Sequence, residues 1–366
     1  MPASSKYRAA VLIDRDGTIN EEVEYLHDPA QLKLLPGAAR AIRILDQENI
    51  AAIICTNQSG IARGYFTEER LQEINGVLVN MLREEGAWVE GIYYSTSLPE
   101  SGDPMRKPNI GMFERAKKEL GLEGIPVYSI GDRTLDVEFG INCGGKGIRV
   151  LTGHQLKEDL PYNQKSLYEA RAKGLAFTME NLLEAVHFIL ADLIRSECAT
   201  DVNMHKKFAD LYTTARALEV ERERENRIVL ANGCFDLLHG GHISYLQSCR
   251  EMGDCLVLAV NSSKSVSRLK GDKRPILPEV DRLQLLAALR CVDYLTIFHE
   301  DSADHVLEAL RPNIHAKGTD YKSENVPERL TSKRLGIETR IAGDPKENSS
   351  RDIIDVVVDR AKAGLL

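Results

Sequence analysis

The chain has 366 residues, of which 43% are hydrophobic and 28% are charged, and its formal net charge is −8. One hydrophobic core seldom organises a chain of this length, so we expect two domains and a connecting segment. The composition excludes a largely disordered chain, and the acidic balance argues against a partner that is nucleic acid. The sequence has neither a bilayer-spanning apolar run nor a signal-peptide pattern, so we expect a cytoplasmic protein that does not bind membranes.

The first 153 residues alternate short apolar runs with longer amphipathic stretches, which is typical of a parallel sheet with crossover helices. Thr67 has the residue type and position of a helix N-cap. One doubly wound α/β domain is therefore expected over residues 1–153. Its predicted strands are 9–13, 51–55, 91–95, 127–130 and 147–151, and its predicted helices include 37–48 and 67–85.

Residues 154–225 lose the strand pattern and predict a helical linker with helices over 179–195 and 202–224. The charge run that ends the second helix is most simply a solvated face, and homo-oligomerisation through these helices is the alternative. A second α/β alternation fills residues 226–366. The predicted fold class is thus α/β, with two doubly wound parallel-sheet (Rossmann-like) domains joined by a helical linker. The predicted strands of the second domain are 228–231, 255–260, 294–298 and 314–316.

Polar side chains follow several predicted strands of the first domain at the point where each strand ends. The strand 9–13 runs into Asp14 and Asp16, two carboxylates that repel each other unless a cation compensates, so we expect a Mg²⁺ ion. Thr56 follows the next strand, Lys107 precedes a helix, and Asp132 follows a later strand with another Asp four residues on. Ligands bind at such strand ends in open α/β sheets.

The order and spacing of these groups resemble the four motifs of the haloacid dehalogenase (HAD) superfamily of phosphatases. The resemblance implies that Asp14 is the nucleophile that forms an aspartyl phosphate and that Asp16 is the general acid and base. It also implies that Asp14, Asp132 and the backbone carbonyl of Asp16 hold Mg²⁺, and that Thr56 and Lys107 hold the phosphoryl oxygens. The full set of candidate substrate contacts is Thr56, Asn57, Arg63, Arg106 and Lys107.

The stretches DRDGTIN, TNQSGIARG and IYY are similar to those of the D-glycero-D-manno-heptose 1,7-bisphosphate 7-phosphatase branch, and histidinol phosphatases are the alternative. Specificity would then come from short loops, with Arg63 as the candidate for gripping a second phosphate, although a solvated loop arginine explains that residue equally well. This branch usually carries a structural zinc. At its ligand positions this chain has Ser95, Ser97, Asp103 and Met105, so we expect no zinc and a loop held by packing.

The second domain opens with a strand that leads into the sequence NGCFDLLHGGH. His239 and His242, three residues apart at the start of a helix, lie on one face of it. The glycine pair between them lets an anion approach the backbone, and the helix N-terminus adds positive potential. We rank phosphate binding above a paired metal site, because the sequence offers no third ligand nearby.

This motif resembles the cytidylyltransferase-like nucleotidyltransferases, and the later motifs KGDKRP, RCVD, KGTDY and SSR look most like a heptose 1-phosphate adenylyltransferase domain. The resemblance implies an in-line attack by a sugar phosphate on the α-phosphorus of ATP, in which His239 and His242 stabilise charge on the phosphates. A CTP-dependent cytidylyltransferase is the alternative. The candidate nucleotide contacts are Asn232, Phe235, His239, His242, Lys273, Arg274, Lys317, Ser349, Ser350 and Arg351.

The two halves agree, because removal of one phosphate from heptose 1,7-bisphosphate yields the heptose 1-phosphate that an adenylyltransferase needs. We therefore expect a bifunctional enzyme that makes ADP-heptose and pyrophosphate from the bisphosphate and ATP, with Mg²⁺ as cofactor. The expected partners are small sugar phosphates and ATP. No segment resembles a sugar kinase, so a separate heptose kinase is expected to supply the bisphosphate. The alternative that is not an enzyme is a degenerate, non-catalytic protein that binds sugar phosphates.

Overall fold

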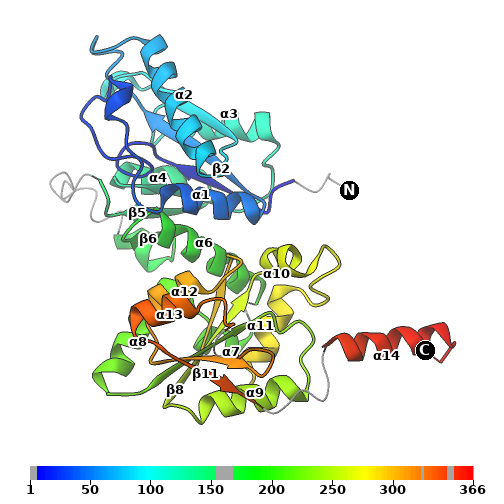
Figure 1. The fold of residues 1–366 in the computed structure, drawn as a ribbon. Helices are drawn as coiled ribbons and strands as arrows, with labels where there is room; N and C mark the ends of the chain where they lie inside the picture. The colour runs from blue at the N-terminus through cyan, green and yellow to red at the C-terminus, as the bar shows by residue number, and fades with distance from the viewer. Residues whose placement is uncertain (1–5, 154–167, 199, 323–324, 344–349, 366) are drawn as a thin grey trace. The chain divides into compact units, whose positions relative to one another are not determined.

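The computed structural model describes residues 6–153, 168–198, 200–322, 325–343 and 350–365. It divides into two compact units, Met1–Ile189 and Leu190–Leu366, and each contains one parallel β-sheet (Figure 1). This architecture confirms the predicted fold class of two doubly wound α/β units. Within the described ranges, no helix is both long enough and apolar enough to span a bilayer.

Six strands of the described chain form the first sheet, in the order β3-β2-β1-β4-β5-β6, and every neighbouring pair is parallel. The strands β1 and β2 are apolar and buried along nearly their whole length, as expected for strands covered on both faces. The bounds are β1 Ala9–Ile13, β2 Ile50–Asn57, β3 Gly91–Ser95, β4 Val127–Gly131, β5 Lys146–Val150 and β6 Ala176–Met179.

Crossover helices connect these strands, and they begin and end where the residue types favour it. The helix α2 (Glu68–Glu84) starts at Thr67, whose hydroxyl accepts a hydrogen bond from the Arg70 N–H, which confirms the predicted N-cap. One face of the sheet packs against α3 (Gly111–Leu120) and α4 (Thr134–Asn142) through a cluster that includes Met112, Phe113 and Phe139. The helix α1 (Ala38–Gln47) packs against β2.

The segment predicted to be a helical linker differs from that prediction in two places. Residues 176–179 form the edge strand β6 of the first sheet, a run too short to be recognised from its pattern. The single helix expected over 202–224 is two helices, α7 (Val202–Lys207) and α8 (Leu211–Glu223). The break occurs because the Asp210 carboxylate caps the N-terminus of α8, while Phe208 is buried and bridges to β9. The helix α6 (Leu182–Glu197) precedes both.

The second sheet has the order β11-β10-β7-β8-β9 among the described strands, again all parallel. Sequence reasoning missed β11, whose residues are only partly buried at the edge of the sheet and therefore lack a continuous apolar run. The bounds are β7 Ile228–Gly233, β8 Cys255–Asn261, β9 Tyr294–Phe298, β10 Ile314–Gly318 and β11 Glu338–Ala342. The helices are α9 Gly240–Arg250, α10 Ser263–Lys270, α11 Glu279–Ala287, α12 Asp304–Leu310, α13 Arg329–Leu335 and α14 Ser350–Lys362.

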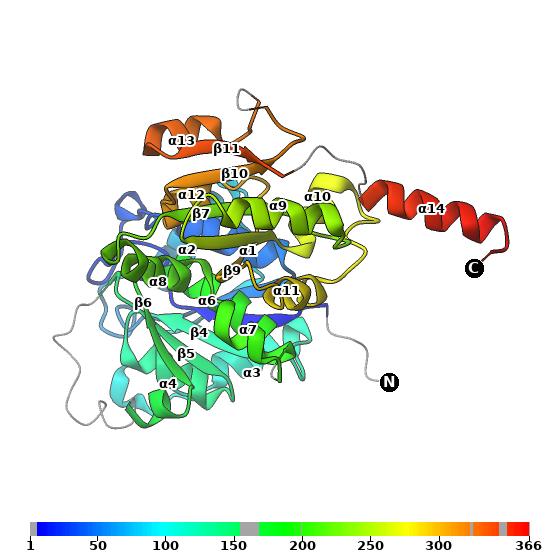
Figure 2. The ribbon, with the colours of Figure 1, turned by 90° about the horizontal axis from the view of Figure 1, so that it is seen from below.

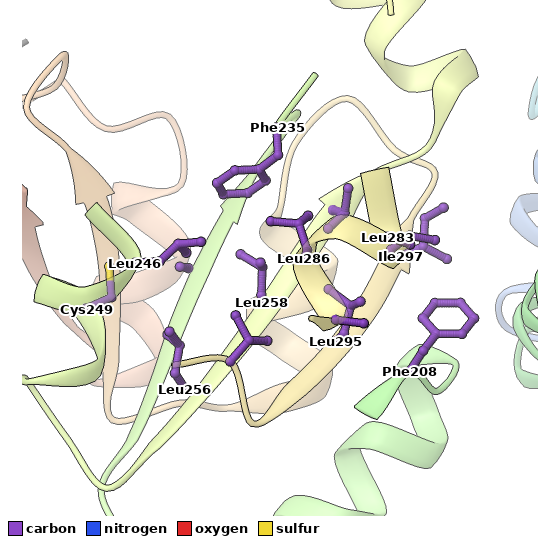
Figure 3. Close-up of a cluster of buried hydrophobic side chains, with 14 of the residues drawn as sticks. Phe208, Phe235, Leu246, Cys249, Leu256, Leu258, Leu283, Leu286, Leu295 and Ile297 are labelled. Atoms are coloured by element: carbon purple, nitrogen blue, oxygen red, sulfur yellow. The ribbon is translucent and has the colours of Figure 1, made fainter. Parts of the chain in front are cut away.

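Successive side chains of the second sheet alternate between two buried clusters. Val229 faces the cluster that includes Leu246 of α9 and Leu286 of α11. Figure 3 shows these two leucines together with Phe235 of the same cluster. Its neighbour Leu230 faces the opposite cluster, which includes residues of α8 and α12. The helix α9, which begins directly after the histidine motif, packs against β7 and β8 (Figure 2). Helices thus cover both faces, and the strand ends stay open for ligands.

Candidate active sites

The first candidate site lies where the strand order of the first sheet reverses, between β1 and β4. Asp14 follows β1, Thr56 lies near the end of β2, and Asp132 follows β4. The carboxyl ends of parallel strands meet at one edge, and the reversal leaves a crevice there between crossovers that leave in opposite directions. The topology therefore gathers side chains that lie far apart in the sequence.

Lys107 ties two carboxylates together at this edge. Its Nζ lies 2.7 Å from Asp14 Oδ1 and 2.5 Å from Asp136 Oδ1, and its side chain is buried. The backbone of Lys107 is held by Asn57, which accepts from its N–H at 3.0 Å and donates to its carbonyl at 3.2 Å. Asn57 thus holds the Lys107 backbone in place, and its contact with substrate stays a prediction. Asp136, four residues after Asp132, completes this ion-pair network, a role that its sequence position alone does not indicate.

Burial shifts the protonation of this network. It raises the pKa of Asp14 above the ordinary value for an aspartate, against the opposing charge of Lys107. For Lys107, burial acts to lower the pKa, but the charges of Asp136 and Asp14 outweigh it and the net pKa is raised. The ammonium therefore stays charged and holds the two carboxylates in place. Because a single ammonium faces several carboxylates, the edge retains an excess of negative charge.

The residues present fit a divalent cation. Asp14, Asp132 and Asp136 each offer a carboxylate oxygen within 4.8 Å of the others, and oxygen donors are the ligands that Mg²⁺ prefers. Gly17 adds to this fit, because a Cβ at that position would lie 2.8 Å from Asp132 Oδ2. Only glycine lets the Asp132 carboxylate approach the motif loop so closely, and the positive φ of 71° at Gly17 also favours it.

The carboxylate of Asp16 is held apart from the Asp14 cluster by three donors. Arg15 forms a two-pronged contact at 3.1 and 2.8 Å, Asn20 Nδ2 donates at 3.0 Å, and Gln58 Nε2 donates at 2.8 Å. Burial acts to raise the pKa of Asp16, but the charge and hydrogen bonds of Arg15 outweigh it and the net pKa is lowered. Sequence reasoning did not foresee that Arg15, wholly buried, and Gln58 orient the predicted acid.

A cavity of about 380 Å³ opens at this edge. Thr56, Asn57, Arg106 and Lys107, all predicted substrate contacts, line it together with the two motif aspartates. Arg63 lies above the ring of Tyr25, with 6.0 Å between its Cζ and the ring centroid, and Tyr25 itself lines the cavity. The remaining lining residues are Glu22, Val23, Glu24, Leu26, Gln58, Ser59, Gly60, Arg133, Leu135 and Asp136.

Three arginines lie near one another at this cavity. Burial lowers the pKa of Arg106, and the charges of Arg133 and Arg63 lower it further, while Glu100 acts in the opposite sense. A guanidinium whose cationic form is disfavoured by like charges gains from a bound anion. These arginines can therefore attract an anionic substrate to the cavity.

The second candidate site lies between β7 and α9. His239 is the N-cap residue of α9, and the ring centroids of His239 and His242 are 4.0 Å apart. The ring of Phe235 packs on His242 with 5.3 Å between centroids, and its backbone has a positive φ of 44°, which is uncommon for a residue with a side chain. The two imidazoles thus lie in contact, with their planes tilted by 34°, at an exposed helix N-terminus, and Gly240 there faces open space.

Two buried charged residues hold the loops of this site in place, and sequence reasoning did not identify either of them. Asp236, buried, accepts from the N–H groups of Ile276 and Leu277 at 2.7 and 3.0 Å and pairs with Arg274 at 2.8 Å. Arg282, also buried, donates to the carbonyls of Cys234 and Asn261 at 2.6 and 2.9 Å. The sequence around Asp236 and Arg282 gives no signal of these partners, because the partners are 21 to 48 residues away.

The other predicted nucleotide contacts have varied surroundings. Lys317 is buried and pairs with Glu328 at 2.9 Å, so its charge is already compensated. Asn232 faces His315, with 2.9 Å between Oδ1 and Nε2, and Lys273 is exposed. Ser349 lies outside the described residues, and Ser350 and Arg351 begin α14 with side chains that are likewise outside the description.

Comparison with known families agrees with this division. A family model described as cytidylyltransferase-like matches residues 230–356. Two further models match the first unit, HAD-hydrolase-like over residues 104–173 and polynucleotide kinase 3 phosphatase over residues 14–133. The matched ranges contain the histidine pair and the strand-end aspartates, respectively.

Individual relatives match parts of the chain. The bifunctional protein HldE of Pelobacter propionicus is 42% identical over 170 residues, which cover 46% of this chain and 35% of that protein. The bifunctional protein HldE of Trichlorobacter lovleyi is 33% identical over 222 residues, covering 61% of this chain and 45% of that protein. The chain thus spans less than half the length of these two relatives.

Among solved structures, a D,D-heptose 1,7-bisphosphate phosphatase from B. bronchiseptica is 26% identical with a TM-score of 0.43, covering 50% of this chain and 98% of that one. A lipopolysaccharide core biosynthesis protein from Thermoplasma volcanium is 34% identical with a TM-score of 0.30, covering 34% of this chain and 99% of that one. By these family models, one part of the chain is similar to HAD-like hydrolases and another part is similar to cytidylyltransferase-like proteins.

Proposed function

We propose that the chain is a bifunctional enzyme that removes the 7-phosphate of heptose 1,7-bisphosphate and then transfers AMP from ATP to heptose 1-phosphate. The products are inorganic phosphate, ADP-heptose and pyrophosphate. The observation that carries the proposal is the convergence of Asp14, Lys107 and Asp136 beside a cavity that Arg106 and Arg133 also line. The adjacent rings of His239 and His242 in the other unit support the second step.

In the phosphatase step, a carboxylate oxygen of Asp14 attacks phosphorus, and the bond from phosphorus to the sugar oxygen breaks. Lys107 neutralises the transferring phosphoryl group, and Thr56 donates to one of its oxygens. A water molecule then attacks the aspartyl phosphate and releases inorganic phosphate, which regenerates Asp14. The ion pair with Lys107 holds the attacking carboxylate before substrate arrives, so little reorganisation is needed.

Asp16 moves the proton in both halves of this reaction. It must be protonated to give a proton to the departing sugar oxygen, whereas its hydrogen bonds favour the ionised form in the free protein. A bound phosphate dianion beside Asp16 disfavours that ionised form and raises its pKa. Substrate binding therefore favours the protonated form of Asp16. After Asp16 has given up its proton, the ionised carboxylate is the base that activates water.

Mg²⁺, held by Asp14 and Asp132 with the backbone carbonyl of Asp16, would supply positive charge to the phosphoryl oxygens. The surplus of carboxylates at this edge supports that assignment. We propose further that the chain holds no structural zinc, because oxygen and thioether groups occupy the four positions Ser95, Ser97, Asp103 and Met105. Metal analysis of dialysed protein checks this, and one zinc per chain would contradict it.

The second step is a direct displacement on the α-phosphorus of ATP. The sugar-phosphate oxygen forms the new bond to phosphorus, and pyrophosphate leaves. His239 and His242 donate hydrogen bonds to the phosphate oxygens, and the backbone N–H groups at the start of α9 add positive potential. We place Arg274 beside the phosphates, held there by Asp236. Ser349, Ser350 and Arg351 remain proposed contacts of the β- and γ-phosphates.

The test mixes the purified chain with heptose 1,7-bisphosphate, MgCl₂ and one nucleoside triphosphate at a time, and identifies the products by mass. We expect phosphate without added nucleotide, and ADP-heptose when ATP is present. A separate kinase is expected to supply the bisphosphate in the cytoplasm. Release of phosphate from histidinol phosphate but not from the heptose, or formation of CDP-heptose but not ADP-heptose, would replace the proposed substrates. No turnover of any of these would refute catalysis.

A further inference from the structure

Asp103 lies at the centre of a hydrogen-bonded loop beside the phosphatase cavity. Its Oδ2 accepts from the hydroxyls of Ser95 and Ser97 at 2.8 and 2.7 Å, and its Oδ1 accepts from the Met105 N–H at 2.9 Å. Its backbone carbonyl accepts from the Arg106 N–H at 3.0 Å. The loop was expected to be held by packing, and hydrogen bonds to this carboxylate hold it instead.

These contacts join two segments that carry groups of the site. Ser95 ends β3, and its carbonyl accepts from the Gln58 N–H at 2.7 Å, while the Gln58 side chain reaches Asp16. On the other side, the turn from Asp103 leads directly into Arg106 and Lys107. The Asp103 carboxylate therefore fixes the distance between the end of β3 and the segment that carries the two cations.

Arg106 closes the same loop with its side chain. Its Nη1 donates to the carbonyl of Ser97 at 2.7 Å, and the guanidinium lines the cavity. A guanidinium has five N–H donors, so the bond to Ser97 orients it while donors remain for an anion. If the loop opened, the Ser97 carbonyl would move away and Arg106 would lose its fixed orientation.

We infer that Asp103 is a positioning residue of the phosphatase site, whose ionised carboxylate holds Arg106 ready to bind the second phosphate of a bisphosphorylated sugar. This inference rests on the proposed function for the identity of the substrate. Lys107 has an additional anchor in Asn57, so loss of the Asp103 contacts affects Arg106 more than Lys107. The role thus concerns binding of the phosphate that is not cleaved, and the chemistry at Asp14 should be little changed.

Ser97 and Ser101 offer a matched test and control, because their hydroxyls contact Asp103 in different ways. Ser97 donates to the Asp103 carboxylate, whereas the Ser101 Oγ accepts from the Asp103 backbone N–H at 3.3 Å. We compare Asp103→Ala, Asp103→Asn and Ser97→Ala with Ser101→Ala. The substrates are heptose 1,7-bisphosphate and an aryl monophosphate with Mg²⁺, and hydrogen exchange of the Met105 and Arg106 amides is measured without substrate.

For Asp103→Ala we expect KM for the bisphosphate to rise about tenfold with kcat nearly unchanged, since one oriented charge-assisted contact is lost. KM for the aryl phosphate should stay the same, and both amides should exchange faster. Asp103→Asn and Ser97→Ala should show smaller changes in the same direction, because each keeps part of the network. Ser101→Ala should resemble the parent chain.

Unchanged amide exchange in Asp103→Ala would overturn the inference, as would an equal loss with both substrates, which indicates a general structural role. Retained turnover of the aryl phosphate shows that the phosphatase unit of each variant is folded. A parent chain with the same KM for bisphosphate and aryl phosphate would refute the proposed bisphosphatase function. A parent preference for the bisphosphate that survives in Asp103→Ala would refute only the role of Asp103.

Discussion

The two candidate sites use the same topology but different kinds of polar group. Both lie where the strand order of a parallel sheet reverses. In the first unit, buried carboxylates surround one ammonium, and ion pairs of 2.7 and 2.5 Å fix the reacting groups in advance. In the second unit, two adjacent imidazoles lie at an exposed helix N-terminus. A covalent intermediate forms only if the protein fixes its own nucleophile in position. Direct displacement between two substrates instead requires a surface that binds their phosphates.

Removal of the held nucleophile gives the largest expected effect. In Asp14→Asn, phosphate release should fall by at least about a thousandfold, because an amide does not form the phosphoenzyme. Nucleotidyl transfer to supplied heptose 1-phosphate should remain within about twofold, since the mutation affects the other unit. The assays are phosphate release from the bisphosphate and pyrophosphate release from ATP. Loss of both activities in a folded variant would show that the two sites are not independent.

Replacement of a phosphate-binding histidine should have a smaller effect, and it should lower nucleotidyl transfer rather than phosphate release. His242→Asn keeps a donor but shortens it and loses the contact with His239, so kcat for pyrophosphate release should fall by about 10²- to 10³-fold. Phosphate release should be unaffected. The variant pair Asp14→Asn and His242→Asn therefore sharpens the comparison, because each variant should retain the activity that the other loses. An intact pyrophosphate release in His242→Asn would remove the histidine pair from the mechanism.

The sequence predicts most of the fold and the framework of the first site for one physical reason. Buried parallel strands appear as continuous apolar runs, and the polar residues that directly follow them must meet at one edge. That argument places Asp14, Thr56 and Asp132 together before any coordinates are known. It also identifies the helix-opening motif of His239 and His242, because their spacing and the adjacent glycines are local properties.

Residues whose partners are distant in the sequence escape this argument. Nothing local distinguishes Arg15, which holds Asp16, or Arg282, which holds two loop carbonyls of the second site. The Asp103 network was missed for the same reason, since a carboxylate among serines has no periodicity. Short edge strands such as β6 and β11 also lack the apolar run on which strand prediction depends.

Stability should also distinguish the units, because a buried neutral histidine lies in the second sheet. Burial lowers the pKa of His315 to about 4, and the charge of Lys317 adds to this effect. The unfolded chain has an ordinary histidine pKa of about 6.5, so between pH 6.5 and 4 the unfolded state binds more protons. The free energy of unfolding should therefore fall by up to roughly 3 kcal/mol as pH decreases through this range.

Chemical unfolding at a series of pH values measures this effect. His315→Asn removes the titrating group while keeping an amide opposite Asn232, so it should flatten the pH dependence of the second unit. His205→Gln, at an exposed position of α7, is the matched control and should leave the slope unchanged. A parent chain whose unfolding free energy is constant between pH 6.5 and 4 would contradict the neutral buried state of His315.

The smallest expected effect concerns the base of the nucleotide, where phosphate-directed residues give no information. His239 and His242 contact phosphate groups that ATP and CTP share, so His242→Asn should lower kcat/KM for both nucleotides by the same factor.

Base choice depends on polar groups that would be left unpaired by the wrong base. The motifs of residues 270–275 and 317–321 resemble an adenylyltransferase, so we expect kcat/KM for ATP to exceed that for CTP by about tenfold. We expect the segment 327–336, which has no clear match in that family, to line the base pocket, and its Glu328 pairs with Lys317. Glu328→Gln should therefore change the ATP-to-CTP ratio, whereas His242→Asn should not. A preference for CTP in the parent chain would replace the adenylyl assignment and leave the histidine chemistry intact, and a ratio altered by His242→Asn would show that the histidines also sense the base.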